Sequence, residues 1–161
     1  MVDTQANIST NSSLVQTLLA SNTTASTMFQ IVWLLIRIIA GGLMIHNGLD
    51  KLADIHGFAD NVVSFIGLPY PVFFTYCAAY VEIISAVLLM LGLLTRLNAL
   101  ALLATMVVAI FFHIKADGLQ IPPLETASLY AGFYAFFLVN GAGQWSLDQL
   151  ITNQVSSSDK A

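Results

Sequence analysis

Apolar residues fill four long segments of the chain, and most polar residues lie before or between them. The segments run from about Met28 to Leu49, Val72 to Leu94, Leu97 to Ile114 and Leu124 to Ala142. A helix needs about 20 residues to cross the hydrocarbon core of a bilayer, and each segment has roughly that length. Backbone groups in lipid must be hydrogen-bonded internally, so we expect all four to be helices. The pattern predicts an all-α, antiparallel four-helix bundle that spans the membrane.

A shorter amphipathic pattern lies in the connection between the first two segments. Its apolar and polar positions fall on opposite helical faces (Phe58, Val62, Phe65 and Ile66 against Asp60, Asn61 and Ser64). This arrangement predicts a short helix in the membrane interface. The run from Gly67 to Pro71 then ends that helix and begins the next long one.

The two ends of the chain are polar. Residues 1–27 are rich in Ser, Thr, Asn and Gln, which is typical of a mobile tail. Residues 152–161 have a similar character, and we expect a second tail there. The sequence therefore predicts one membrane domain, residues 28–151, between two disordered ends.

Composition agrees with a membrane protein and excludes other classes. The chain is 57% hydrophobic and 9% charged, with a mean hydropathy of +0.80, whereas a soluble domain has about 25% charged residues. The net charge of −4 argues against a nucleic-acid partner, which requires a basic face. The single cysteine, Cys77, excludes a disulfide relay within the chain. The lipid bilayer is the expected environment.

Two charged residues interrupt the apolar segments. Arg37 lies inside the first segment and Glu82 inside the second, where a charge is costly and usually functional. With a rise of about 1.5 Å per residue, antiparallel counting from the segment ends brings both to a similar depth. We therefore predict that Arg37 and Glu82 form a buried ion pair. Such a pair could fix the helix register or form the wall of a ligand pocket, and both interpretations stay open.

Other polar residues gather at the helix ends. An even number of spans places both termini on one side, the terminal side, and the turns near residues 50–71 and 118 on the other, the far side. The far side collects His46, Lys51, His113 and Glu125. Together with Arg37 and Glu82 they are the predicted ligand-binding residues. We expect no metal site, because no metal-ligand spacing is present.

The terminal side has its own polar set. Arg96 lies in the short link between the second and third segments, and Asp148 comes after the fourth. A contact between these two side chains would tie the link to the C-terminal region. We predict a structural role for both. Gly141 is expected to end the fourth helix, and Ser146 or Asp148 to cap the next stretch of chain.

Small residues recur every four positions on three of the predicted helices. The rows are Ala78, Glu82 and Ala86; Ala101, Thr105, Ala109 and His113; and Ala127, Ala131 and Ala135. Small side chains at this spacing let helices approach closely in lipid. We interpret the rows as packing faces.

Several short motifs resemble the DoxX family of small four-helix membrane proteins. They are Arg37-Ile38 with Gly41-Gly42, His46 through Leu52, Val81 through Ile83, Leu91 through Arg96 and Gly141 through Asp148. The resemblance covers about residues 30–151, and the positions that match are Arg37, His46, Gly48, Lys51, Glu82, Arg96, Ser146 and Asp148. It implies a bacterial-type protein of the inner membrane, and a structural role for Gly48.

The resemblance also implies a link to redox chemistry. Family members are associated with quinone-linked oxidation of sulfur compounds or with oxidative-stress complexes that contain a partner enzyme. A fold does not by itself carry a reaction, and no cofactor motif is present in the sequence, so whether the chain is itself an oxidoreductase stays open.

Three functions result as hypotheses. The first is a redox-associated subunit whose polar pocket binds a small ligand such as a quinone. The second is a structural or assembly subunit of a larger membrane complex or homo-oligomer, and the third, less favoured, is a small transporter. Lys and Arg residues flank both sides equally, and the position of Arg96 in a short link leads us to expect cytoplasmic termini.

Overall fold

The computed structural model describes residues 17–158, and this part of the chain is helical without a strand. Four long helices carry the fold: α2 (Thr27–Ala53), α5 (Pro71–Leu91), α6 (Thr95–Asp117) and α7 (Ile121–Asn140). The connection after α2 contains α3 (Ile55–Phe58), the π-helix η1 (Ala59–Val63) and α4 (Ser64–Ile66), and the chain closes with α8 (Leu147–Ser158). The prediction of an all-α protein is confirmed.

Three of the long helices, α2, α5 and α6, are long and apolar enough to cross a membrane within the described residues. The fourth, α7, has 20 residues but carries Pro122 and Glu125 in its first turns. Polar residues in a segment of this length lower its preference for lipid. The fourth span therefore stays a prediction.

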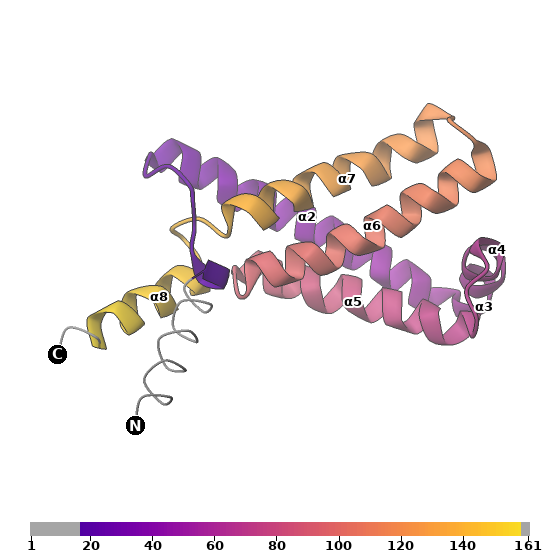
Figure 1. The fold of residues 1–161 in the computed structure, drawn as a ribbon, viewed down its shortest axis with the longest axis horizontal. Helices are drawn as coiled ribbons and strands as arrows, with labels where there is room; N and C mark the ends of the chain where they lie inside the picture. The colour runs from indigo at the N-terminus through magenta and orange to yellow at the C-terminus, as the bar shows by residue number, and fades with distance from the viewer. Residues whose placement is uncertain (1–16, 159–161) are drawn as a thin grey trace, which may run out of the picture.

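The long helices run in alternating directions, and each packs on its neighbour in the chain (Figure 1). We call the end with the α5–α6 turn and the segment 141–146 the terminal end. The opposite end, with α3, η1, α4 and the α6–α7 turn, is the far end (Figure 1). A cluster of fully buried side chains, among them Leu89, Leu102 and Phe137, fills the space between the helices on the side of the terminal end.

Two glycines bring α2 and α5 into close contact. A Cβ atom added to Gly41 would lie 3.0 Å from the carbonyl oxygen of Ala86, and one added to Gly48 would lie 3.0 Å from that of Ala79. Both distances are shorter than an ordinary side chain tolerates, so glycine is required for this approach. The spacing of seven residues places both glycines on one face of α2.

The two polar ends of the chain are more ordered than the sequence analysis expects. Within residues 17–26, Leu19 is buried, and the Asn22 amide donates to the carbonyl of Asn140 at 2.8 Å. The segment satisfies backbone groups left open where α7 ends. Residues 1–16 lie outside the described part of the chain.

At the other end, α8 continues to Ser158, into residues 152–161, for which the sequence predicts a tail. Asp148 in the first turn favours the helix through the backbone dipole. Side-chain contacts one turn apart support it, as Gln149 donates to Asn153 at 3.0 Å. Residues 159–161 lie outside the described part.

Candidate functional site

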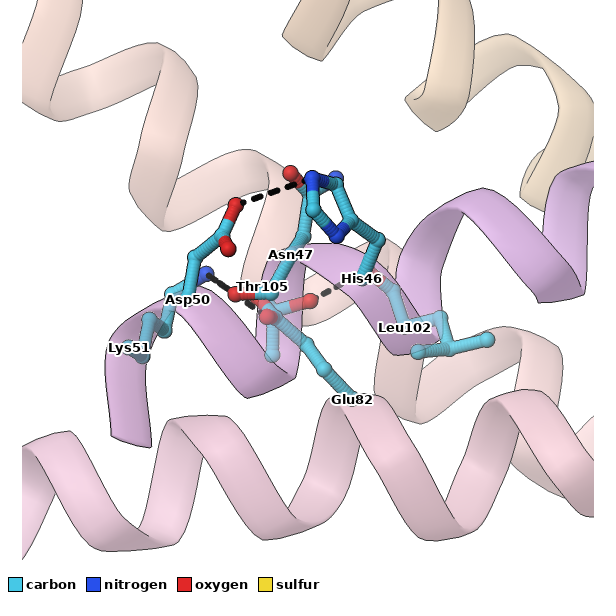
Figure 2. Close-up of polar contacts among 7 residues, drawn as sticks. All are labelled: His46, Asn47, Asp50, Lys51, Glu82, Leu102 and Thr105. Carbon is cyan, nitrogen blue, oxygen red and sulfur yellow. Dashed lines mark hydrogen bonds and ion pairs between the residues drawn. The ribbon is translucent and has the colours of Figure 1, made fainter. Parts of the chain in front are cut away.

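Lys51 and Glu82 form an ion pair between α2 and α5. Lys51 Nζ lies 2.6 Å from Glu82 Oε2, and Lys51 also donates to the Asn47 carbonyl at 3.3 Å (Figure 2). The Lys51 ammonium is 5.1 Å from the centre of the Phe58 ring. The side chains are 15% and 3% exposed respectively, so the Lys51 ammonium is partly buried and the Glu82 carboxylate is buried.

The length of α2 makes this pair possible. The helix continues to Ala53, so Lys51 is still helical and lies one turn after Gly48, near the face of α2 that carries Gly41 and Gly48. That face of α2 lies against α5. One turn after the close contact at Gly48, the Lys51 side chain reaches Glu82 of α5.

A cavity of about 640 Å³ lies beside the ion pair at the far end. This volume lies within the range of small-molecule sites, about 300–1,000 Å³. Its walls are mostly apolar and come from all four long helices and from the α2–α5 connection (Asn47, Lys51, Phe58, Val62, Val63, Ile66, Leu68, Phe74, Cys77, Ala78, Val81, Glu82, Ala101, Ala104, Thr105, Met106, Val108, Ala109, Phe112, His113, Thr126, Ala127 and Tyr130). The arrangement places one charged pair in the wall of an otherwise apolar space.

A few neutral polar groups also line the cavity. Among the described residues, the Asn47 amide and the Tyr130 hydroxyl have no hydrogen-bond partner, so both can bind a ligand. The Thr105 hydroxyl donates to the Leu102 carbonyl at 2.8 Å, and its oxygen can still accept. The site therefore offers donors and acceptors as well as charge.

The short α3–η1–α4 segment covers one side of the cavity. Three of the four predicted apolar positions, Phe58, Val62 and Ile66, line the cavity. The fourth, Phe65, packs edge-on against Phe112 of α6, and its carbonyl accepts a hydrogen bond from Lys115 at 2.7 Å. The apolar face thus covers the hollow between the helices. The π-helix η1 lies in the middle of this segment, and such helices are frequent at functional sites.

Arg37 does not belong to this cavity. Its guanidinium donates to the carbonyl of Ala142 through Nη1 and to that of Trp145 through Nη2, the latter at 2.7 Å. The predicted pair between Arg37 and Glu82 is wrong, because each has other partners and the structure gives no contact between them within the described residues.

Unequal helix ends explain this error. Arg37 lies beside Gly92, the residue that ends α5, so α2 begins well beyond the α5–α6 turn. Glu82 lies ten residues before Gly92, about 15 Å along the helix axis. The sequence argument counted Arg37 and Glu82 from opposite sides of the membrane. This assumes that the start of α2 is level with the end of α5.

The terminal end contains a dense hydrogen-bond network around Arg37. Asp148 accepts from the backbone amides of Leu94 and Thr95 at 2.7 and 2.9 Å, which holds Leu94 in a left-handed conformation. Arg96 donates instead to the carbonyl of Val139 at 3.0 Å. The predicted contact between Asp148 and Arg96 is therefore wrong, although both side chains stabilise turns at this end.

The punctuation predicted after the fourth helix is confirmed. Gly141 ends α7 with a positive φ of 77°. The Ser146 hydroxyl accepts from the Gln149 amide at 3.2 Å and so caps the first turn of α8. The network also includes Gln30 and Trp33, which the sequence analysis did not select; they bond to Gln144 and Gly141.

The remaining predicted residues differ in position. His113 lines the cavity and lies 3.4 Å from Asp117. His46 points away from Glu82 toward Asp50, at 3.4 Å, and its side chain is 74% exposed (Figure 2). Glu125 is exposed and does not line the cavity. Of six predicted ligand residues, the structure thus brings together Lys51, Glu82 and His113.

The sequence contained one signal for the missed cavity residues. Thr105 belongs to the small-residue row on α6, and all four members of that row line the cavity. Small side chains there leave space where larger ones would fill it. Asn47 and Tyr130 carried no comparable signal. In the described residues, no three His, Cys, Asp or Glu side chains gather as metal ligands.

Comparisons with known proteins agree with a membrane protein. The DoxX family model matches residues 32–114, which include Lys51 and Glu82. The chain is 29% identical over 135 residues to an uncharacterized membrane protein of Mycobacterium tuberculosis, covering 76% of this chain and 82% of that protein. It is 38% identical over 76 residues to an uncharacterized protein of Haemophilus influenzae, covering 44% of this chain and 57% of that protein. No solved structure matches the chain.

Proposed function

This chain belongs to the DoxX family of membrane proteins, and on that premise we propose that it binds a quinone in the cavity beside Lys51 and Glu82 as a redox-associated subunit. The observation that carries the proposal is the ion pair in the wall of an apolar cavity of about 640 Å³. Buried charges in membrane segments mark functional sites, because their cost must be offset.

The chemistry of the cavity suits a quinone head group. A quinone is an apolar ring with two carbonyl oxygens that accept hydrogen bonds. Apolar side chains such as Val81 and Met106 can hold the ring. Asn47, Lys51 and Tyr130 supply N–H or O–H donors for the carbonyls.

The ion pair gives the cavity a carboxyl group that can carry a proton. Reduction of a quinone to a quinol takes up two electrons and two protons, and a carboxyl group can pass protons to the developing hydroxyls. Glu82 takes this part in the proposal, with Lys51 holding its charge when it is ionised. The electrons come from a partner protein in the membrane.

The membrane arrangement is part of the proposal. We place α2, α5, α6 and α7 as four antiparallel spans in a bacterial inner membrane, with α3, η1 and α4 in the interface and both termini in the cytoplasm. Reporter fusions test this directly: a fluorescent protein should be active at either terminus. Phosphatase activity at the C-terminus alone would mean that α7 does not span.

Binding is tested by filling the cavity. The protein is purified in nanodiscs and titrated with decylubiquinone. Ala109 lines the cavity, so Ala109→Phe should remove binding. Val107, on the same helix, is 56% exposed and does not line it, so Val107→Phe should bind like the wild type. If both variants bind equally well, the assignment of this cavity is wrong.

A structural or assembly subunit is the second candidate. The outward face of α7 carries Phe133 and Phe136, which are 40% and 63% exposed, and could pack against another membrane protein. Two results together would favour this candidate. Neither the isolated wild type nor Ala109→Phe would bind decylubiquinone, and gently purified complexes would contain a stoichiometric partner.

A further inference from the structure

A second hollow lies on the outer surface, between α2 and α7. It has a volume of about 430 Å³, and its lining is apolar apart from two hydroxyl side chains (Ile36, Ile39, Ala40, Leu43, Thr126, Leu129, Tyr130 and Phe133). We call this hollow the α2–α7 groove. Its side chains Ile39, Leu43 and Leu129 are 58%, 51% and 57% exposed, so the groove is open to the surroundings of the protein.

The groove and the cavity share part of their walls. Thr126 and Tyr130 of α7 line both hollows. Helical spacing also joins them along α2, because Ala40 and Leu43 line the groove and Asn47, one turn later, lines the cavity. The two spaces are therefore neighbours on the same helix faces, and Thr126 and Tyr130 stand between them.

Two contacts join these helices in their halves toward the terminal end. Trp33 packs on Phe137 with ring centres 4.8 Å apart, and the Tyr134 hydroxyl lies 3.4 Å from the Ala40 carbonyl. Beyond these contacts α2 and α7 diverge toward the far end (Figure 1). The α2–α7 groove is lined on the α7 side by Tyr130, whose ring stacks on Tyr134 with the ring centres 6.1 Å apart.

We propose that the α2–α7 groove is a lateral entrance to the cavity and holds the apolar tail of its ligand. The inference rests on the proposed function, and it narrows the ligand class to lipid-borne molecules with a polar head and a long hydrocarbon or isoprenoid chain. The head group lies beside Lys51 and Glu82, and the tail passes Thr126 and Tyr130 into the groove. A molecule of this kind enters from the bilayer without crossing water.

The character of the groove argues for a tail. Its lining offers one hydroxyl from Thr126 and one from Tyr130 and otherwise only hydrocarbon and aromatic surface, which suits a chain without polar groups. A separate phospholipid would also fill an apolar groove, but its head group would gain nothing from the two wall residues, Thr126 and Tyr130, that the groove shares with the cavity. A helix of a second copy is another occupant, and binding and crosslinking experiments separate these cases.

The test compares two probes that differ only in the tail. Decylubiquinone carries a ten-carbon chain, and 2,3-dimethoxy-5-methyl-1,4-benzoquinone has the same head without it. Leu43 and Leu49 lie on the same helix and are both 51% exposed, and only Leu43 lines the groove. Leu43→Trp should weaken decylubiquinone binding by about tenfold or more, since overpacking expels the tail. Binding of the tailless probe should change by less than about twofold. The matched control Leu49→Trp should bind both probes like the wild type.

The outcomes separate the inference from the proposed function. If neither probe binds the wild type, the proposed function fails. If Ala109→Phe loses both probes while Leu43→Trp keeps both, the cavity assignment holds and the lateral entrance is overturned. Loss of both probes in a folded Leu43→Trp variant would also overturn it, because the effect would then not depend on the tail.

Crosslinking gives a second readout that does not depend on a variant. A decylubiquinone derivative with a diazirine at the end of its tail is activated by light in nanodiscs, and the adducts are mapped by mass spectrometry. Adducts in residues 36–43 and 126–133 that compete with unlabelled decylubiquinone support the inference. Adducts confined to the cavity residues of α5 and α6 would overturn it, as would groove adducts that persist under competition, which would indicate bulk lipid or a second copy.

Discussion

Arg37 and Lys51 lie on one face of α2, but their surroundings are opposite. Arg37 is 1% exposed, and its guanidinium donates to two backbone carbonyls of the segment after α7. Lys51 pairs with Glu82 in the wall of a cavity. Both are cations in an apolar helix, Arg37 buried and Lys51 partly buried. A buried cation that donates to backbone carbonyls, as Arg37 does through Nη1 and Nη2, stabilises the fold, whereas one beside an open space can also serve a ligand.

The two ends of the molecule extend this contrast. At the terminal end, Asp148 bonds to the backbone of the α5–α6 turn, and Ser146 and Gln30 both bond to the backbone of segment 141–146. At the far end, small side chains such as Ala78 and Ala109 leave a hollow. In the proposed function, the densely bonded end would hold in place the helices that surround the cavity.

The largest expected effect is at Arg37. Arg37→Leu leaves the carbonyls of Ala142 and Trp145 without their donor, and each buried unsatisfied group costs about 1–3 kcal/mol. We expect a loss of about 4 kcal/mol in the free energy of unfolding, measured by SDS titration in mixed micelles. Arg37→Lys keeps the charge but not the two-pronged donor geometry, and should lose less.

The ligand affinity of the Arg37 variants is the control. Because Arg37 lies at the terminal end, decylubiquinone should bind the folded fraction within about twofold of the wild type. An Arg37 variant that lost decylubiquinone binding while its stability was unchanged would show that the ligand binds at the terminal end. Arg37 and not Lys51 would then be the ligand-binding cation.

The second effect is at the ion pair. Lys51→Met leaves a buried carboxylate without its partner, which should lower the free energy of unfolding by about 3 kcal/mol. Glu82→Leu should act similarly through the unpaired ammonium. The double variant Lys51→Met with Glu82→Leu should regain much of the stability, because replacing a buried pair by apolar side chains is often neutral.

A double-mutant cycle measures the coupling in the same unfolding assay. We expect a coupling of about 1–3 kcal/mol between the two positions. Quinone binding should be weak in all three variants, including the stable double variant. A double variant that binds normally would show that the pair is purely structural, like Arg37.

A smaller loss of stability is expected at Gly48, where α2 packs closely on α5. Gly48→Ala places a Cβ atom 2.6 Å from Ile83 Cγ1 and 3.0 Å from the Ala79 carbonyl, so α2 must move from α5. We expect a loss of about 1–2 kcal/mol and weaker binding, since Lys51 moves with the helix. Gly42→Ala is the matched control, because nothing lies within 4 Å of its Cβ position. It should be neutral or stabilising by up to about 1 kcal/mol in thermal unfolding.

The smallest effects are expected at the two predicted residues that lie outside both regions. His46 is exposed and pairs only with Asp50 four residues on, and Glu125 is exposed at the start of α7. His46→Ala and Glu125→Gln should each change the free energy of unfolding by less than about 0.5 kcal/mol. Their decylubiquinone affinities should match the wild type. A large loss of binding in either variant would extend the site beyond the cavity.

Much of the helical framework could be predicted from the sequence. The four apolar segments and the amphipathic connection match helices within a few residues, because hydrophobic pattern and helix length are set directly by local sequence. The resemblance to DoxX is confirmed by the family match. The extension of α2 to Ala53 and of α8 to Ser158 was not predicted, because polar residues such as Lys51 and Asp148 made those stretches look like loops.

The small-residue rows show why the cavity itself was not predicted. Alanines at four-residue spacing are typical of close helix packing in lipid, and the sequence analysis interpreted Ala101, Thr105 and Ala109 in that way. The close approach is instead at Gly41 and Gly48 of α2. The glycines of α2 and the small residues of α6 both leave space beside the backbone. The distance to the neighbouring helix decides whether that space becomes a close helix contact or a hollow.

Hydrophobic pattern alone identifies this chain as a helical membrane protein with charges inside its apolar segments, and it places Glu82, Lys51 and His113 among the polar candidates. The folded structure was needed to show that Glu82 pairs with Lys51 and that Arg37 donates to the carbonyls of Ala142 and Trp145. The physical reason is that hydrophobicity and helical phase are local properties of the chain. The relative height of two helices depends on where each one ends against its neighbours, and here α2 begins well beyond the end of α5.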